Sequence, residues 1–235
     1  MLEKTLNLGG VPLLVVPASP VPEREAGGTV LFYHGFTVSK EANRIELHRL
    51  ARAGLTAVGV DAVGHGDRRF ADFSKRFEPP NQEAVFQEVV EESAAEIPAL
   101  LDSLEARGLS DGRRVGICGV SMGGAIAFGA LAREGRLVAG VTLVSTPVWG
   151  SRPDSPHLIP ERFYPKALLV QTAGADQTVP PARIRAFVEV LRPYYQAAPE
   201  RLAYLEYPGV DHLMPARIWG QMIDQAVEWL KRFVR

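Results

Sequence analysis

Apolar positions along the chain gather in short runs that are bounded by Gly, Pro, Asp or other turn-forming residues. Runs of this length, rich in Val, Leu and other strand-forming residues, are typical of strands buried on both faces. The pattern predicts strands over residues 5–8, 11–16, 29–33, 56–60, 114–118, 141–144, 167–171 and 202–207.

Between these runs, apolar residues recur every three or four positions, the spacing of a helix with one buried face. This spacing predicts helices over residues 40–53, 82–107, 125–133, 182–191 and 218–233. We expect the first of them to end at Gly54 and the second to be kinked at Pro98. The residues expected to face the core in the first and last helices are Ile45, Leu47, Leu50, Ala51, Trp219, Met222, Ile223, Val227 and Leu230.

Strands that alternate with helices indicate an α/β fold, here a mostly parallel sheet of about eight strands with helices on both faces. The two N-terminal strands are the expected antiparallel exception, because Gly9-Gly10 between them suits a tight hairpin turn. No repeat, low-complexity tract or linker interrupts the pattern. We therefore expect residues 1–235 to form a single domain.

Charge and composition narrow the possible functions. The 26 basic and 27 acidic side chains leave a net charge of −1, which argues against binding nucleic acid or a membrane through bulk positive charge. No signal-peptide pattern or membrane-length apolar run is visible. The single cysteine, Cys118, is expected to be a buried and inert thiol, so the sequence favours a cytoplasmic protein with no disulfide.

The strongest chemical motif follows the predicted strand 114–118, in the sequence Gly119-Val-Ser121-Met-Gly123. A G-x-S-x-G pattern between a strand and a helix places the serine on a sharp, strained turn, where a base can reach its hydroxyl group. The flanking glycines let the strand and the helix pack closely. Ser121 is therefore the candidate nucleophile.

A serine nucleophile needs a general base and a carboxylate that orients the base. Of the five histidines, only His212 lies both after a strand and late in the chain. Asp176 is the first acidic residue after the strand 167–171. In a parallel sheet the chemistry lies beyond the carboxyl ends of the strands, so Ser121, Asp176 and His212 could meet there.

The chain resembles the α/β-hydrolases over nearly its whole length. The resemblance rests on four segments in the expected order: His34-Gly35-Phe36-Thr37, the motif around Ser121, Gly174-Ala-Asp176-Gln-Thr-Val-Pro180, and Asp211-His212. It implies the α/β-hydrolase fold, with Ser121 as nucleophile, His212 as general base and then acid, and Asp176 as the orienting acid. His34-Gly35-Phe36-Thr37 is similar to the corresponding loop of small esterases that act on aryl or cinnamoyl-type esters.

The same resemblance implies an oxyanion hole made by the backbone N–H groups of Phe36 and Met122. His34, Gly35 and Trp149 are candidate pocket residues, and no metal or cofactor is expected. The segment 145–166 is too short for a large helical lid, so the site should be fairly open, with Phe70, Phe73 and Phe77 as an alternative apolar wall.

One further loop, Asp61-Ala-Val-Gly64-His65-Gly66-Asp67-Arg68-Arg69, is rich in polar side chains. A structural turn is favoured here over a metal site formed by Asp61, His65 and Asp67, because no second group of ligands accompanies them. The two arginines could attract an anionic substrate group, but pairing or solvation at the surface is favoured.

These observations favour a serine carboxylesterase that cleaves small soluble acyl or aryl esters. The fold alone leaves open a peptidase, a thioesterase or a lactonase. A dehalogenase is disfavoured, because it would need an acid in place of Ser121. A non-catalytic receptor for small ligands on the same scaffold is also possible, although each of the three catalytic positions carries the residue that catalysis requires. The oligomeric state stays open.

Overall fold

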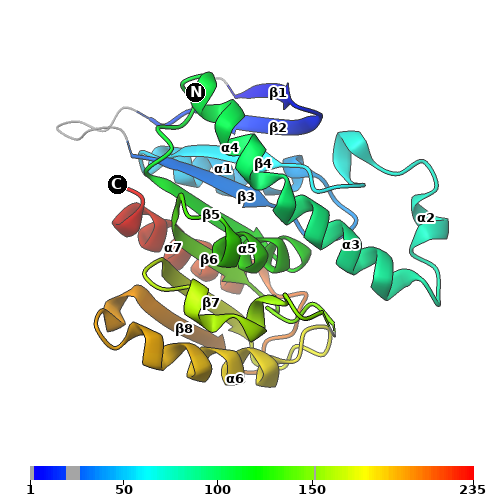
Figure 1. Cartoon of the computed structure of the whole chain (residues 1–235), viewed down its shortest axis with the longest axis vertical. Coiled ribbons are helices and arrows are strands. Elements are labelled where there is room, and N and C mark those ends of the chain that lie inside the picture. The colour runs from blue at the N-terminus through cyan, green and yellow to red at the C-terminus, as the bar shows by residue number, and fades with distance from the viewer. Residues whose placement is uncertain (1–2, 20–26, 151) are drawn as a thin grey trace.

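The computed structural model describes residues 3–19, 27–150 and 152–235, which are arranged around one eight-stranded sheet (Figure 1). The strands lie in the order β1-β2-β4-β3-β5-β6-β7-β8. β1 pairs antiparallel with β2, β2 pairs antiparallel with β4, and the remaining pairs are parallel. The prediction of a mostly parallel sheet of about eight strands is confirmed. The strands span Lys4–Leu8, Val11–Val16, Thr29–Tyr33, Thr56–Val60, Val115–Val120, Leu137–Leu143, Ala167–Ala173 and Leu202–Tyr207 in chain order from β1 to β8.

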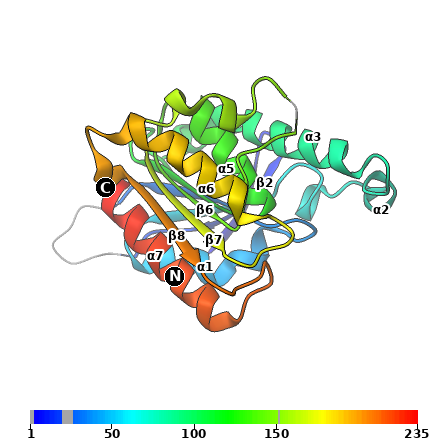
Figure 2. The ribbon, with the colours of Figure 1, turned by 90° about the horizontal axis from the view of Figure 1, so that it is seen from below.

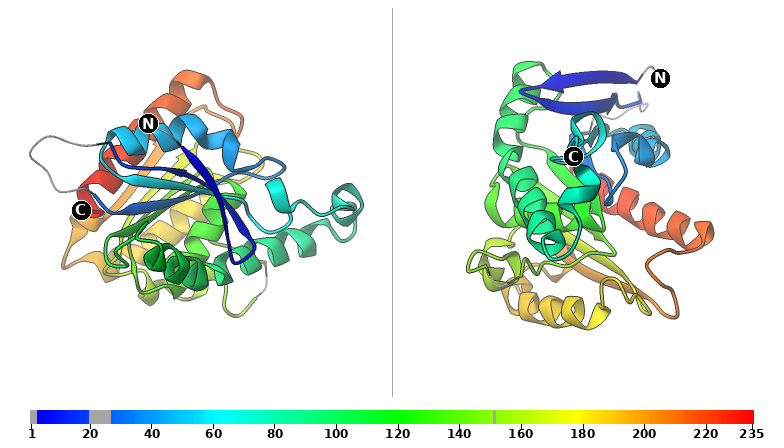
Figure 3. Two further views of the ribbon diagram at one scale, coloured as in Figure 1. Left: turned by 90° about the horizontal axis from the view of Figure 1, so that it is seen from above. Right: turned by 90° about the vertical axis from the view of Figure 1, so that its right-hand side faces the viewer.

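Helices cover both faces of the sheet, as the views along its edges show (Figures 2 and 3). One face carries α3 (Gln82–Ala95), α4 (Ile97–Ala106), α5 (Met122–Arg133) and α6 (Pro181–Leu191), and the other carries α1 (Arg44–Arg52) and α7 (Ala216–Phe233). Each layer encloses its own hydrophobic core. Leu31 of β3 belongs to the first core and its neighbour Phe32 belongs to the second. Since successive side chains of a strand point to opposite faces, two covered faces require strands that are apolar throughout.

The predicted N-terminal hairpin is present. β1 and β2 are joined at Gly9 and Gly10, whose φ angles are 60° and 88°. Glycine adopts such positive φ angles without the steric cost that other residues incur. The hairpin adds β1 and β2 to the β4 side of the parallel sheet.

The predicted helix over residues 40–53 is divided into a 3₁₀ turn, Lys40–Asn43, and α1. Leu47, Leu50 and Ala51 are buried as expected, but the prediction for Ile45 is wrong, because its side chain is 71% exposed. Glu46 takes the inward position instead, and its carboxylate accepts a hydrogen bond from the Trp219 indole at 2.7 Å. The buried stripe of this helix therefore includes one polar residue that hydropathy alone assigns to the solvent.

The predicted long helix over residues 82–107 consists of two helices, α3 and α4, separated at Glu96. Pro98 lies in the first turn of α4, where its missing N–H group costs no helical hydrogen bond. A short helix that the pattern did not predict, α2 (Phe73–Arg76), lies in the loop between β4 and α3. This loop projects from the body of the molecule (Figure 1).

Candidate active site

Ser121 occupies the sharp turn between β5 and α5. Its φ angle is 54°, in the region that residues other than glycine rarely adopt. A Cβ atom on Gly119 would lie 2.0 Å from the carbonyl oxygen of Gly123, and a Cβ atom on Gly123 would lie 2.1 Å from that of Tyr33. Both glycines are therefore required for the close approach of β3, β5 and α5, as the motif predicts.

The structure brings Ser121 and the two other predicted side chains together at the carboxyl ends of the parallel strands. The Ser121 hydroxyl Oγ lies 3.0 Å from His212 Nε2, and His212 Nδ1 lies 2.7 Å from Asp176 Oδ2. These distances suit a chain of hydrogen bonds from the serine hydroxyl through the imidazole to the carboxylate. The geometry is the one that general-base activation of a serine requires.

The Asp176 carboxylate is held in place by its own loop. Its Oδ1 accepts hydrogen bonds from the backbone N–H groups of Thr178 at 2.9 Å and Val179 at 2.7 Å, which leaves Oδ2 for His212. The Asp176 side chain is fully buried, whereas 16% of the His212 side chain is exposed. The carboxylate is thus fixed and shielded from solvent, and the imidazole is partly exposed.

Two backbone N–H groups are available beside Ser121. Met122 is the first residue of α5, and Phe36 lies in the loop after β3. None of the backbone hydrogen bonds outside helices and strands in the described part of the chain uses either N–H group. A Cβ atom on Gly35 would be only 3.9 Å from Ser121 Cβ, so the loop after β3 lies against the turn between β5 and α5 that carries Ser121, the nucleophile elbow. Free N–H groups in this position can stabilise a developing oxyanion.

A network of charges centred on the buried side chains of Lys40 and Asp61 fixes the loop after β3. The Lys40 side chain is fully buried, and its Nζ donates to Asp61 Oδ2 at 2.9 Å and to Asp67 Oδ2 at 2.7 Å. Asp61 Oδ1 also accepts the backbone N–H of Lys40 at 2.8 Å, which connects the loop after β3 to the loop after β4. Burial lowers the pKa of Lys40, but the hydrogen bonds that its ammonium donates to Asp67, Asp61 and Glu41 outweigh this and raise the pKa, so the ammonium stays charged.

Side chains of the loop 61–69 form several contacts within the protein. The Arg68 guanidinium donates twice to the carbonyl oxygen of Asp61 and forms two hydrogen bonds, of 2.9 and 2.7 Å, with the Glu96 carboxylate. Arg69 lies over the Phe73 ring, 3.6 Å from its centroid. Neither arginine is among the residues that line the cleft beside Ser121. No group of three or more His, Cys, Asp or Glu side chains among the described residues could hold a metal ion.

His65 packs against Phe36 of the loop after β3. Its ring lies 5.4 Å from the Phe36 ring, and 5.1 and 6.2 Å from the rings of Phe73 and Phe77. Nδ1 pairs with the carbonyl oxygen of Val63 at 2.9 Å, and burial lowers the pKa of this histidine. A neutral imidazole among three phenyl rings fills space behind Phe36, the residue with the free N–H group.

His34 is fully buried and does not line the cleft. Its Nε2 accepts the backbone N–H of Ala62 at 3.1 Å, and its Nδ1 pairs with the carbonyl oxygen of Gly35 at 2.7 Å. Burial lowers the pKa of His34 to about 4. The pocket role predicted for His34 and Gly35 does not fit these positions: the first joins two loops, and the second gives the loop its close approach to Ser121.

The buried His34 predicts a loss of stability in mild acid. In the unfolded chain the imidazole titrates near a pKa of about 6.5, whereas the folded value is about 4. Between these values the unfolded state binds a proton that the folded state does not, so the free energy of unfolding falls as the pH decreases from 6.5 to 4. His34 alone contributes up to about 3 kcal/mol to this fall.

Urea denaturation at several pH values between 7 and 4 measures this dependence. We expect His34→Gln to flatten the dependence below pH 6.5. Equal pH dependence in the wild type and in His34→Gln would contradict the attribution of this loss of stability to His34.

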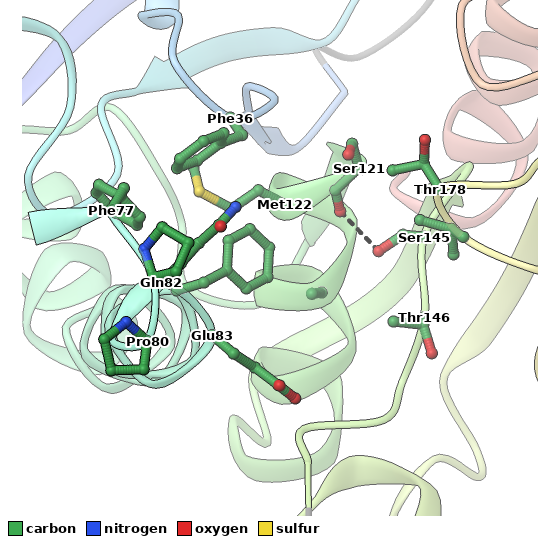
Figure 4. A pocket seen from close by; sticks show the side chains of 14 residues that line it. Phe36, Phe77, Pro80, Gln82, Glu83, Ser121, Met122, Ser145, Thr146 and Thr178 are labelled. Carbon is green, nitrogen blue, oxygen red and sulfur yellow. Dashed lines mark hydrogen bonds between the residues drawn. The ribbon is translucent and has the colours of Figure 1, made fainter. Parts of the chain in front are cut away.

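A cleft of about 540 Å³ opens beside Ser121 (Figure 4). Apolar side chains form one side of it, and the hydroxyl-bearing Ser145, Thr146 and Thr178 lie on the other side. Of the three phenylalanines expected to form an apolar wall, only Phe77 lines the cleft. The apolar residues that line it are Phe36, Phe77, Pro79, Pro80, Phe86, Met122, Ala125 and Val179.

Two residues near the cleft differ from the sequence prediction. Trp149 is 3% exposed and lines a smaller hollow of about 180 Å³ next to the cleft, rather than the cleft itself. Phe86 of α3 lines both spaces, and sequence reasoning missed it. In a helix, an apolar residue is read as core unless its orientation is known, so no sequence signal separated Phe86 from its buried neighbours Val89 and Val90.

The fold and the strand–serine–helix turn are those of a known family of enzymes. Residues 30–233 match the model of the alpha/beta hydrolase family. The chain belongs to the α/β-hydrolase family. The solved structure of TT1662 from Thermus thermophilus has the same fold as this hydrolase, with a TM-score of 0.80 at 24% identity over 100% of this chain and 99% of that chain.

Two curated proteins resemble the hydrolase in sequence. The Bacillus subtilis (strain 168) protein named "Putative esterase YitV" is 28% identical over 97% of both chains. The Escherichia coli (strain K12) protein named "Esterase YjfP" is 31% identical over 66% of this chain and 60% of its own length. In the described residues of the hydrolase, no helix has both the length and the apolar character that crossing a membrane requires.

Proposed function

We propose that the hydrolase is a carboxylesterase that cleaves small-molecule esters through an acyl-enzyme on Ser121. The observation that carries this proposal is the continuous path from Ser121 Oγ to His212 at 3.0 Å and on to Asp176 at 2.7 Å, next to a largely apolar cleft. The names of the two curated relatives, which are both called esterases, support the ester as the substrate bond.

In the proposed reaction, Ser121 Oγ forms a bond to the ester carbonyl carbon while His212 Nε2 accepts the hydroxyl proton. The carbonyl oxygen becomes an oxyanion, to which the N–H groups of Phe36 and Met122 donate. Each such donor typically contributes about 3 kcal/mol to transition-state stabilisation. Asp176 keeps the Nδ1 proton of His212 in place and stabilises the imidazolium.

The ester C–O bond then breaks, and His212 returns its proton to the leaving alcohol. A water molecule, deprotonated by His212, attacks the acyl group on Ser121, and the serine hydroxyl re-forms as the carboxylic acid departs. These steps require only protein groups and water. We further propose a cytoplasmic location, because the one cysteine is a buried free thiol that needs no oxidising compartment.

Hydrolysis of 4-nitrophenyl acetate tests the proposal. We expect a burst of 4-nitrophenol stoichiometric with enzyme where deacylation is slower than acylation, and steady turnover afterwards. A fluorophosphonate should stop the reaction and add its mass to the peptide that contains Ser121. Labelling at a different residue, or turnover that the reagent does not affect, would refute the assignment.

The same assay separates this proposal from a receptor and from other acyl hydrolases. A receptor would give neither turnover nor labelling of Ser121. A thioesterase would prefer the matched thioester to the oxygen ester by kcat/KM. Serine peptidases also cleave esters faster than amides, so the distinguishing result for a peptidase is measurable turnover of the matched peptide amide. We expect the oxygen ester to be hydrolysed and the matched amide to show no detectable turnover.

A further inference from the structure

The cleft beside Ser121 has two chemically different ends. Phe36, Phe77 and Met122 lie on one side of Ser121, and Thr178 lies on the other (Figure 4). The aromatic end is built by the loop after β3, by α5 and by the projecting segment between β4 and α3. The hydroxyl-bearing end is built by the loops after β6 and β7.

The position of the proton donor determines which part of an ester occupies each end. The leaving oxygen must come within hydrogen-bond reach of His212 Nε2, because that atom protonates it. His212 is held by Asp176, whose loop continues directly into Thr178 and Val179 at the hydroxyl-bearing end. The alcohol part of the substrate therefore leaves on that side, and the acyl part extends toward the aromatic end.

The dimensions of the whole cleft leave room for an acyl group much larger than acetyl. The cleft of about 540 Å³ shares Glu83, Phe86, Ala125 and Thr146 with the smaller hollow of about 180 Å³, so the two spaces adjoin. Volumes in this range accommodate whole small-molecule ligands. Rings and proline side chains along the wall gain most from an apolar partner that displaces water.

The charge in the cleft is negative. Glu83 of α3 is the one charged residue among the described residues that line the cleft, and its side chain is drawn between those of Pro80 and Thr146 (Figure 4). A carboxylate at this position repels an acyl chain that ends in a second carboxylate. Arg183 lines the smaller hollow and is not among the residues that line the cleft.

We propose that the aromatic end of the cleft is the acyl subsite, and that it selects bulky, uncharged acyl groups such as phenylpropanoyl or medium-length alkanoyl chains while Glu83 disfavours dicarboxylate half-esters. This inference rests on the proposed ester hydrolysis at Ser121 and specifies its substrate class.

The size of the acyl group is tested with Gln82→Trp, which adds a large side chain at an exposed residue that lines the cleft. We expect the ratio of kcat/KM for 4-nitrophenyl 3-phenylpropanoate to that for the acetate to fall by about tenfold or more. Gln221→Trp, at an exposed position of α7, is the matched control and should leave the ratio unchanged.

A second series with a constant acetyl group and larger alcohols tests the direction of binding. Gln82→Trp should leave the ratios within that alcohol series unchanged. An effect on the alcohol series but not on the acyl series would overturn the assignment of the two ends. If neither the acetate nor the 3-phenylpropanoate is hydrolysed through Ser121, the proposed function fails together with this inference. If either is hydrolysed, and the ratios do not respond, only the acyl subsite fails.

The charge selection is tested with 4-nitrophenyl hexanoate and the 4-nitrophenyl half-ester of adipic acid, whose acyl chains have equal length. The wild type should prefer the hexanoate, and Glu83→Gln should reduce that preference by about five- to tenfold. Glu88→Gln removes an equal charge from the same helix at a residue outside the cleft and should change it by less than about twofold. A wild-type preference for the adipate half-ester that disappears in Arg183→Gln would overturn the proposal.

Discussion

Replacing Ser121 by alanine should lower kcat for ester hydrolysis by at least about 10⁴-fold, the largest effect expected of any single substitution in this chain. The substitution removes the oxygen that forms the acyl-enzyme and leaves His212 without a proton to accept. Stopped-flow and steady-state assays with 4-nitrophenyl acetate measure both the burst and the turnover, and both should be lost.

The matched control is Ser103→Ala, a serine of α4 whose hydroxyl bonds only to the carbonyl oxygen of Ala99 one turn earlier. Its kcat should stay at the wild-type value. At the positive φ angle of Ser121, alanine meets the same backbone restriction as serine, and among the described residues the Ser121 hydroxyl bonds only to His212. The alanine variant should therefore fold normally, which circular dichroism can verify. Retention of more than a few per cent of wild-type turnover in a folded Ser121→Ala protein would exclude the proposed acyl-enzyme.

Replacing Lys40 by methionine should destabilise the protein by about 3–5 kcal/mol. The substitution keeps the apolar length of the side chain but leaves the fully buried Asp61 carboxylate without its cation. Urea denaturation at pH 7 measures the change in the free energy of unfolding. Since Asp61 also bonds to the backbone N–H of Lys40, the variant should misplace the loop that carries Phe36 and lower kcat as well.

Lys75→Met, at an exposed position of α2, is the matched control and should change stability by no more than about 0.5 kcal/mol. Lys40→Met combined with Asp61→Asn should recover part of the lost stability, because the amide needs no buried counter-charge. A Lys40→Met protein as stable as the Lys75→Met control would show that the buried ion pair makes no net contribution.

The strands and the positions of Ser121, Asp176 and His212 after them could be predicted because each depends on short-range sequence. A strand covered on both faces must be apolar throughout, so β3 and β4 were predicted with their observed bounds, Thr29–Tyr33 and Thr56–Val60. The elbow around Ser121 is a local motif, and the topology of a parallel sheet then brings the ends of β5, β7 and β8 to one edge.

The parts that could not be predicted depend on contacts between distant segments. Lys40 begins a helical turn, where a lysine is expected in solvent, and only the fold brings Asp61 and Asp67 to its ammonium group. Glu46 and Ile45 exchange their expected positions because the indole of Trp219, far along the chain, offers the carboxylate a hydrogen bond. Hydropathy carries no information on such partners.

The segment that borders the cleft could be predicted only in part, since Phe77 was expected in its apolar wall and Pro79 and Pro80 were not. Phe77, Pro79 and Pro80 come from the loop between β4 and α3. Its phenylalanines stand between charged residues with no regular period, so the sequence indicates an apolar wall but not which of the rings faces the cleft. The aromatic contacts of Phe36 with Phe73 and Phe77, at ring-centroid distances of 5.7 and 4.8 Å, show how this loop is attached to the site.

Cys118 lies in the central strand β5, three positions before Ser121 in the sequence, and it is completely buried. Burial raises the pKa of its thiol, so both access and ionisation keep it from reacting while the sheet is closed. A thiol reagent can therefore modify this chain only when the central strands open, and the rate of modification measures how often they do so. The same protection leaves every newly introduced surface cysteine free to be labelled selectively, with a spectroscopic probe or a surface tether, in the otherwise wild-type sequence.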